Sequence, residues 1–262
     1  MVTFRIEAPS MADLYFSFFT LFIILPLTLL AFLYFIVRPR PIRIPIKNRH
    51  VFITRESSGI GLALAHRAAA EGARVSILSR SLNKLEKARN AVKLATGMEV
   101  AVFEAEVRDY DAVKRAVDEA GHIDVLILSH GVFPALEFEK IELDEVKYTM
   151  DVNVIGCFNL IKAVLPAMKN RKDPLPASIA FVSSQAGQVL LEIKLINVGV
   201  YGYVVRSKIF FTYVAYCTNK FGLRGLAESL QHEVIADNIH VSLIFPPDTN
   251  TPGTVEGIEL NS

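Results

Sequence analysis

The fold is indicated by one stretch of the sequence, HVFITRESSGIGLALAHRAAA at residues 50–70. Residues 50–53 have the β-branched and aromatic character of a short buried strand, whereas apolar residues recur with helical spacing from 60 to 71. The turn between these two elements contains Gly59 and Gly61. A strand, a glycine turn and a helix in this order predict the start of a parallel α/β sheet.

The same turn, from Thr54 to Gly61, is the first candidate binding site. Glycines let the backbone come close to a pyrophosphate, two serines offer hydroxyl donors, and the N–H groups of the following helix attract an anion. A Gly-x-Gly sequence alone is often only a tight turn, but its place directly after the first strand favours phosphate binding. We therefore expect an anion-binding group made of Ser57, Ser58, Gly59, Ile60 and Gly61.

Strand-like and helix-like segments alternate along the rest of the chain to residue 245. We expect strands at 50–53, 74–78, 100–104, 124–128, 178–182 and 240–245, and helices at 60–71, 82–95, 111–120, 143–169 and 215–236. Strands separated by helices of this length are parallel and joined by crossovers, so the sequence predicts an α/β, Rossmann-type doubly wound sheet. Such a sheet binds its ligand beyond the carboxyl ends of the strands.

Two basic residues follow the second predicted strand. Arg80 stands at its end, and Lys84 lies one helical turn further along. In dinucleotide-binding sheets an acidic residue at this place binds the ribose of NAD, whereas a basic residue suits the 2′-phosphate of NADP. Either cation alone would be read as a solvated surface charge. Together, and without an acidic residue at the strand end, they predict NADPH as the cofactor.

The candidate catalytic residues are Tyr216 and Lys220. Residues four apart lie on one face of a helix, so the ammonium can favour loss of the phenol proton and also contact a cofactor ribose. This makes Tyr216 a candidate general acid for a carbonyl oxygen whose carbon receives hydride. Tyr-x-x-x-Lys spacing is common by chance, but here it follows a strand that ends in Ser183 and Ser184, and Asn153 lies on the preceding long helix.

Residues 14–37 form a run of 24 residues without a charged side chain. A helix needs about 20 residues to cross a bilayer, so we expect a transmembrane helix here. Pro26 is compatible with such a span where neighbouring groups satisfy the freed carbonyl. A cleaved signal peptide is the alternative, but its apolar region normally has about 7–15 residues and ends in a small-residue cleavage site. The sequence therefore favours an uncleaved anchor.

Basic residues flank the predicted span unequally. Only Arg5 precedes it, whereas five basic residues follow it: Arg38, Arg40, Arg43, Lys47 and Arg49. By the positive-inside rule, the larger part of the chain lies in the cytosol. We expect a lumenal N-terminus at 1–13, the transmembrane helix at 14–37, a basic Pro-rich linker at 38–49 and the catalytic domain at 50–262.

Composition excludes several other classes of protein. The 28 basic and 27 acidic residues give a net charge of +1, so no overall field would attract nucleic acid. With 52% hydrophobic residues the chain is not disordered. Cys157 and Cys217 are too few and too far apart for a disulfide framework or a zinc module, and the histidines form no pair at metal-ligand spacing. We expect reduced thiols and no metal.

The sequence from residue 50 to residue 253 resembles the short-chain dehydrogenase/reductase family. The turn at 54–61 matches the family's cofactor turn, and the other matching positions are Asn153, Ser184, Tyr216 and Lys220. The resemblance implies that Tyr216 donates a proton, Ser184 holds the carbonyl oxygen and Lys220 binds the ribose. It further implies that Asn153 supports a proton relay and that Glu106 contacts the adenine.

Two segments resemble one branch of this family more specifically: VSSQAGQ at 182–188 and FPPDTNTPG at 245–253. That branch uses NADPH to reduce 3-ketodihydrosphingosine, a membrane-borne long-chain keto amine, at the cytosolic face of the endoplasmic reticulum. The resemblance implies a function in sphingolipid biosynthesis and the lipid bilayer as a partner, which gives the N-terminal anchor a purpose. It also makes the helix at 143–169 a candidate homodimer face.

The chain departs from the family pattern at several places. Arg55 occupies a position that is glycine in the family's cofactor turn, where its side chain would crowd the pyrophosphate. Ser129-His130-Gly131 stands in place of the usual Asn-x-Gly after the fourth predicted strand. Ser184 and Tyr216 are 32 positions apart, further than in the family. This spacing predicts two insertions, near 190–198 and 204–214.

The sequence leaves two alternatives open. One is a membrane-anchored short-chain dehydrogenase that acts on a retinoid or a steroid, against which the two specific segments speak. The other is a catalytically inactive family member, suggested by Arg55 and by the insertions. The end of the chain at Ser262 supports the same alternative, because it predicts a C-terminally truncated sheet without its last strand.

Overall fold

The computed structural model describes residues 10–37, 42–54, 59–134, 136–187 and 214–246. Contacts divide the chain into two units, Met1–Arg43 and Ile44–Ser262, and each is described by itself. The predicted insertions up to residue 213 and the chain after residue 246, where the last strand was expected to be missing, lie outside the described residues. The same holds for Arg55, Ser57 and Ser58 of the predicted cofactor turn.

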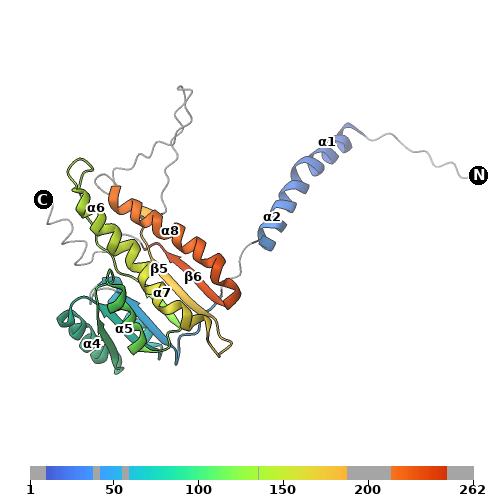
Figure 1. Cartoon of the computed structure of the whole chain (residues 1–262). Helices are drawn as coiled ribbons and strands as arrows, with labels where there is room; N and C mark the ends of the chain where they lie inside the picture. Colours follow the sequence, from blue (N-terminus) through green and yellow to red (C-terminus); the bar gives the residue numbers. More distant parts are fainter. Residues whose placement is uncertain (1–9, 38–41, 55–58, 135, 188–213, 247–262) are drawn as a thin grey trace, which may run out of the picture. The chain divides into compact units, whose positions relative to one another are not determined.

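The N-terminal unit is one helix in three parts (Figure 1): α1, Met11–Phe19; the π-helical turn η1, Thr20–Ile24; and α2, Leu25–Val37. The three parts make 27 residues, the most apolar 18-residue stretch has a mean hydropathy of 2.6, and none of the 27 residues is buried. A helix of this length is about 40 Å long, enough for the roughly 30 Å apolar layer of a bilayer. It is therefore a candidate transmembrane span, and it begins three residues before the predicted one.

The polar groups of this helix find partners within it. Ser10 and Asp13 form a capping box, which binds two N–H groups at the helix start. The hydroxyls of Thr20 and Thr28 donate to backbone carbonyls four and three residues earlier. The π-helical turn ends at Ile24, two residues before Pro26, which has no N–H to offer the preceding turn. Internal pairing of this kind suits a surrounding without water.

The second unit contains a six-stranded sheet in which every neighbouring pair of strands is parallel. The strands are β1, His50–Thr54; β2, Arg74–Ser79; β3, Val100–Glu104; β4, Val125–Leu128; β5, Ala177–Val182; and β6, Ile239–Ile244. Their order in the sheet is β3-β2-β1-β4-β5-β6. The chain adds β2 and β3 on one side of β1 and then crosses over to add β4, β5 and β6 on the other side, so the strand order reverses between β1 and β4. The predicted doubly wound sheet is confirmed, and each strand lies within one residue of its predicted limits.

Helices connect the strands (Figure 1). They are α3, Gly59–Ala70; α4, Leu82–Thr96; α5, Tyr110–Ala120; α6, Leu143–Met150; α7, Gly156–Lys169; and α8, Val214–Val234, with 3₁₀ turns η3, Gln185–Gly187, and η5, Ile235–Asp237. The predicted helix at 143–169 is present, but a π-helical turn, η2, Asp151–Ile155, joins α6 to α7. This wide turn carries Asn153 at a point where the α-helical hydrogen bonding is interrupted.

Two apolar cores lie on the two faces of the sheet. Because strand side chains alternate, Phe52 of β1 belongs to one core and its neighbours Val51 and Ile53 belong to the other. The larger core joins one face to α5, α7 and α8, and the smaller core joins the opposite face to α3 and α4. Ile44 and Ile46, from the predicted linker, pack against the smaller core. Helices on both faces thus hold the strand ends that carry the candidate site.

The helix from Leu143 to Lys169, with 27 residues, is also long and apolar enough to span a membrane, and its most apolar 18-residue stretch has a mean hydropathy of 1.3. However, 44% of its most apolar stretch is buried inside the protein. Leu160 and Met168 are completely buried in the larger core. We therefore interpret it as a core helix of the sheet unit.

Candidate functional site

A pocket that is open to solvent lies at the carboxyl ends of the strands. Its wall is formed by residues 78–80 at the end of β2, residues 105–107 directly after β3, residues 130–132 after β4, and Val152 of η2. A doubly wound sheet binds its ligand at this edge, next to the point where the strand order reverses.

The start of α3 offers N–H groups at the same edge of the sheet. Its first residue, Gly59, has a φ of +67°, in the left-handed region. A residue with a β-carbon is strained there, so the backbone path from the turn into the helix requires glycine. Gly61, two residues further on, is buried. The start of α3 thus lies at the place where the glycine pattern predicts anion binding, and that binding stays a prediction.

Asn153 of η2 is fully buried and holds the segment after β4 in place. Its Oδ1 accepts a hydrogen bond from the backbone N–H of Val132 at 2.7 Å, and its Nδ2 donates one to the carbonyl of Val132 at 2.9 Å. A β-carbon on Gly131 would lie 3.1 Å from Oδ1 of Asn153, so glycine leaves room for this contact. The Asn153 side chain thus fixes one wall of the pocket.

A line of buried side chains joins β1 to Asn153 through His130. Nδ1 of His130 lies 2.7 Å from Oγ1 of Thr54, the last residue of β1, and Nε2 lies 3.6 Å from Sγ of Cys157. The Cys157 thiol lies 3.3 Å from the carbonyl oxygen of Asn153. Hydrogen bonds connect all four residues in one arrangement of the protons. In it, the Thr54 hydroxyl donates to Nδ1 of His130, Nε2–H of His130 donates to the sulfur of Cys157, and the Cys157 thiol donates to the carbonyl of Asn153. We call these four residues the His130 line.

Gly156 makes room for the His130 line. A β-carbon on Gly156 would lie 2.8 Å from Cγ2 of Val107 and 3.0 Å from Nε2 of His130. Burial raises the pKa of the neighbouring Cys157 thiol to about 12, although the ammonium of Lys220 acts in the opposite direction. The thiol therefore keeps its proton at neutral pH and can donate it to a hydrogen bond.

Tyr216 and Lys220 lie at the start of α8, on one helix face as predicted. Nζ of Lys220 is 5.4 Å from the centre of the Tyr216 ring and donates a hydrogen bond to the carbonyl of Val182 at 3.2 Å. Lys220 is buried, with 4% of its surface exposed. The ring of Tyr216 meets that of Phe133 edge to face, with centroids 4.7 Å apart. Because Phe133 directly follows the pocket wall at 130–132, Tyr216 lies at the same end of the sheet as the pocket.

Ser184 follows β5 and leads into η3, against which α8 packs. Its Oγ accepts a hydrogen bond from the N–H of Ala186 at 3.2 Å. A β-carbon on Gly187 would lie 2.8 Å from the carbonyl oxygen of Lys220 and 2.9 Å from Oγ of Ser183. Glycine at 187 thus allows η3 to pack closely against α8, which brings Ser184, directly before η3, near Lys220 of α8.

Two buried polar side chains near this contact have no hydrogen-bond partner among the described residues. They are Ser183, through its hydroxyl, and Asn219, through both atoms of its amide. Asn219 directly precedes Lys220 on α8 and is 1% exposed. Because buried polar groups normally pair, both indicate a place where a water molecule or a polar ligand group is accommodated.

Comparison with known proteins assigns the family. Residues 49–202, more than half of the 262 residues, match the family described as short chain dehydrogenase. The chain belongs to the short-chain dehydrogenase family.

This short-chain dehydrogenase is 63% identical to the 3-dehydrosphinganine reductase TSC10A of Arabidopsis thaliana over 221 residues. The aligned residues make up 84% of this chain and 62% of the relative. The chain is 58% identical to the 3-dehydrosphinganine reductase TSC10B of the same plant over 238 residues, which make up 91% of this chain and 66% of that relative. The chain therefore spans less than two thirds of either relative. The crystal structure of a short-chain dehydrogenase from Shigella flexneri complexed with NADP matches at a TM-score of 0.68 and 20% identity, over 83% of this chain and 84% of that one, which shows the fold.

The predicted site residues of the short-chain dehydrogenase differ in where the structure places them. Arg80 and Glu106 line the pocket. Asn153 and Lys220 are buried in the contacts described above, and Tyr216 and Ser184 are half-buried beside them. Lys84 is exposed on the first turn of α4 and does not appear among the described residues of the pocket wall. Ser57 and Ser58 lie outside the described residues, and the catalytic and binding roles stay predictions.

Several residues of this site were not singled out from the sequence of the short-chain dehydrogenase. They are Phe133, Tyr148, Cys157 and His130. Only His130 carries a sequence signal, because Ser129-His130-Gly131 departs from the family pattern. The contacts that join the other three to the site, with His130, Tyr216 and Arg80, span 27 to 83 positions, too far for any local pattern.

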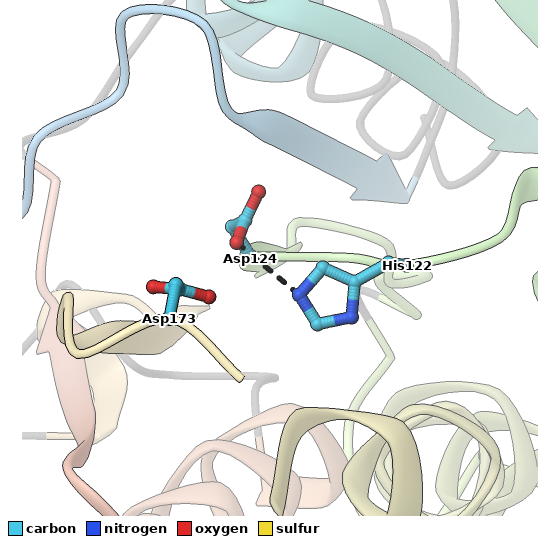
Figure 2. A group of neighbouring side chains, drawn as sticks. All are labelled: His122, Asp124 and Asp173. Atoms are coloured by element: carbon cyan, nitrogen blue, oxygen red, sulfur yellow. Dashed lines mark ion pairs between the residues drawn. The ribbon is translucent and has the colours of Figure 1, made fainter. Parts of the chain in front are cut away.

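One group of side chains at the amino ends of the strands has the geometry of a cation site. It consists of His122, Asp124 and Asp173, whose ligand atoms all lie within 4.8 Å of one another (Figure 2). Asp124 is already paired with Arg49, whose Nη2 lies 2.9 Å from Oδ1, and its Oδ2 accepts a hydrogen bond from the N–H of His50 at 2.8 Å. This carboxylate thus joins the starts of β1 and β4, and we assign it that structural role.

Proposed function

We propose that this chain reduces 3-ketodihydrosphingosine to dihydrosphingosine with NADPH, a step of sphingolipid biosynthesis. The observation that carries the proposal is the 63% identity to a 3-dehydrosphinganine reductase over 84% of the chain. The geometry supports it, because Tyr216 and Lys220 lie together at the edge of the sheet that holds the pocket. Since the chain spans 62% of that relative, the activity has to be measured on this chain itself.

The residues of the pocket fit a nicotinamide dinucleotide with a 2′-phosphate. Arg80 lines the wall where a basic side chain suits that phosphate, and Glu106 lines it where it can accept from the adenine amino group. Gly59 opens a helix whose N–H groups suit the pyrophosphate. The buried ammonium of Lys220 is a donor for ribose hydroxyls. Bound at these residues, NADPH would supply the hydride.

The chain itself provides the proton for the reduction. Tyr216 donates its phenolic proton to the ketone oxygen as hydride reaches the carbonyl carbon, which gives a secondary alcohol. Ser184 holds that oxygen by a hydrogen bond. Lys220 stabilises the phenolate that Tyr216 becomes, because an ammonium favours a nearby negative charge. A solvent proton then restores the phenol, with Asn153 supporting the relay.

The N-terminal helix suits a substrate that resides in lipid. We propose that Met11–Val37 anchors the chain in the endoplasmic reticulum membrane and that the sheet unit faces the cytosol, as the basic residues after the span favour. A second copy of the chain is a proposed partner through α6 and α7. Met150, Ile155 and Phe158 support that surface, because these apolar side chains are exposed.

The experiment is a reductase assay on the full chain in mixed detergent micelles that contain 3-ketodihydrosphingosine. NADPH consumption and the formation of dihydrosphingosine, identified by mass spectrometry, are followed together. Tyr216→Phe should lower the rate by about 10²–10⁴-fold, the usual contribution of a general acid, and leave NADPH binding unchanged. Tyr110→Phe is the control, since Tyr110 is also a half-buried tyrosine, and it packs against the larger core from α5. Equal rates for the wild type and Tyr216→Phe would contradict the mechanism.

Two further measurements separate the alternatives. Retinal and a steroid ketone, offered in the same micelles, should be reduced far more slowly than the keto amine. A reversed preference would assign the chain to a different substrate. Titration of NADPH by its fluorescence tests the inactive alternative, because absence of binding would leave the fold without its chemistry.

A further inference from the structure

The ring of the proposed general acid, Tyr216, lies against a second aromatic ring. The centroids of Phe133 and Tyr216 are 4.7 Å apart, and the two ring planes make an angle of 85°. Aromatic side chains favour this edge-to-face arrangement, because the positive edge of one ring meets the negative face of the other. Nζ of Lys220 lies 5.4 Å from the centre of the same tyrosine ring. Tyr216 is thus contacted by a residue of its own helix and by one from the segment after β4.

Tyr216 stands on the first turn of α8 and is half-buried. The first N–H groups of a helix have no partner within the helix, so its first turn is held less firmly than its middle. A tyrosine side chain can adopt several staggered rotamers about its χ1 bond. At such a position, the choice among these rotamers depends on the groups that pack against the ring.

Phe133 is held by both of its neighbours in the chain. The N–H and the carbonyl of Val132 are both hydrogen-bonded to the buried amide of Asn153, at 2.7 and 2.9 Å. Pro134, on the other side, is buried and has a fixed φ. A residue that precedes proline is itself restricted to extended backbone conformations. The ring of Phe133 therefore projects from a well-defined backbone.

The described part of the pocket wall includes Val132 but not Phe133. The ring of Phe133 instead meets the side chain to which the proposed function assigns the proton. The backbone segment that Asn153 fixes thus also determines where the ring of Tyr216 can lie.

We propose that Phe133 is a positioning residue for Tyr216 in the reduction of the ketone. Its ring keeps the tyrosine side chain in the rotamer that lies beside Lys220. The inference rests on the proposed reductase function, in which Tyr216 donates the proton. Phe133 acts through Tyr216 and does not touch the reacting atoms. Its loss therefore lowers the rate of proton transfer and leaves binding of the cofactor unchanged.

The first test is kinetic and uses the full chain in mixed micelles. Phe133→Met keeps a flexible apolar side chain but removes the ring, so kcat for the ketone should fall about 2- to 10-fold, the value of an edge-to-face pair. KM for the ketone and the dissociation constant of NADPH should stay unchanged. Phe133→Tyr keeps the ring and should retain most of kcat. Phe103→Met is the matched control, because Phe103 is also half-buried and pairs with Phe52, at a centroid distance of 5.9 Å.

The solvent isotope effect distinguishes positioning from a merely structural role. Because a displaced phenol transfers its proton more slowly, the ratio of kcat in light water to kcat in heavy water should be larger in Phe133→Met than in the wild type. Phe103→Met should keep the wild-type kcat and the wild-type ratio. A wild-type kcat in Phe133→Met would overturn the inference. A higher KM for the ketone at unchanged kcat would also overturn it, because Phe133 would then be a substrate contact.

A measurement without the ketone separates this inference from the proposed reduction. In protein labelled with fluorotyrosine, the fluorine signal that is lost in Tyr216→Phe belongs to Tyr216, and it senses a ring packed against it. The signal should shift in Phe133→Met and keep its place in Phe103→Met. An unshifted signal in Phe133→Met would overturn the inference. A shift in a chain that reduces no ketone would support the placement of Tyr216 by Phe133 and refute the proposed reduction.

Discussion

Nε2 of His130 lies 3.6 Å from Sγ of Cys157, and this contact completes the His130 line from Thr54 to the carbonyl of Asn153. One end of the line is Thr54, the last residue of β1 and the first residue of the predicted cofactor turn. The other end is the residue whose side chain fixes the pocket wall at Val132. A change in the middle of the line is therefore expected to affect the placement of Asn153.

Cys157→Ala should lower the rate of ketone reduction because it breaks the His130 line next to Asn153. The loss of a hydrogen bond of this kind corresponds to about 2- to 10-fold in kcat, with less change in KM for NADPH. Cys157→Ser keeps a group that can both donate and accept, so it should retain most of the activity. Steady-state kinetics of the two variants decide the matter, and equal losses in alanine and serine would speak against the line.

Gly187→Ala should destabilise the sheet unit, because its β-carbon would lie 2.8 Å from the backbone oxygen of Lys220. Forcing a methyl group into a packed contact costs about 1–3 kcal/mol. Gly225→Ala, on the same helix as Lys220, meets no atom within 4 Å and should leave the protein as stable or up to about 1 kcal/mol more stable. Chemical unfolding of both variants measures the difference, and equal shifts would show that η3 and α8 are not in close contact.

Stability should fall in mild acid because of His50. Burial lowers the pKa of its imidazole below the ordinary 6.5, more strongly than the hydrogen bond to the His122 carbonyl raises it. The unfolded chain therefore takes up a proton that the folded chain refuses, so stability is complete above about pH 6.5 and is lost as the pH falls below it.

His50→Gln should flatten this part of the stability curve, since an amide does not titrate. Thermal unfolding at several pH values between about 7.5 and 5.5 checks it. His232→Gln, an exposed position on the last turn of α8, should keep the wild-type slope. A slope that is the same in His50→Gln and the wild type would contradict the assignment.

Leu25→Lys should reduce membrane attachment. The substitution puts an ammonium near the middle of Met11–Val37, which costs about 2.5–3.5 kcal/mol for insertion into a bilayer. The measurement is the fraction of protein left in the membrane pellet after alkaline extraction. Leu175→Lys, at an exposed position of the sheet unit, is the control and should stay with the membrane. Full retention of Leu25→Lys would exclude this helix as the anchor.

The sheet and its helices could be predicted from the sequence because their signals are local. Residues 50–54 are all buried, and their β-branched and aromatic side chains already indicate a strand covered on both faces. The helix that carries Tyr216 and Lys220 was also predictable, since a spacing of four residues alone puts both side chains on one helix face.

The rest of the site depends on packing between distant segments. Arg80 meets Tyr148 across 68 positions, and His130 meets Thr54 across 76, so no local pattern reveals either contact. The π-helical turn at Asp151–Ile155 was also not predicted, because the apolar spacing of 143–169 fits an uninterrupted helix. Those contacts are decided by tertiary structure, which the resemblance to a family did not describe.

The π-helical turn sets the angular phase between the two halves of the long helix. Each residue of an α-helix advances the chain by about 100° around its axis, so removal of one residue from 151–155 would rotate α6 against α7 by about that angle. Tyr148 would then turn away from Arg80, while α7 stayed in its core. The number of residues in this turn therefore constrains the short-chain dehydrogenase more tightly than the identity of most of them, and natural variation there should consist of substitutions and not of insertions or deletions.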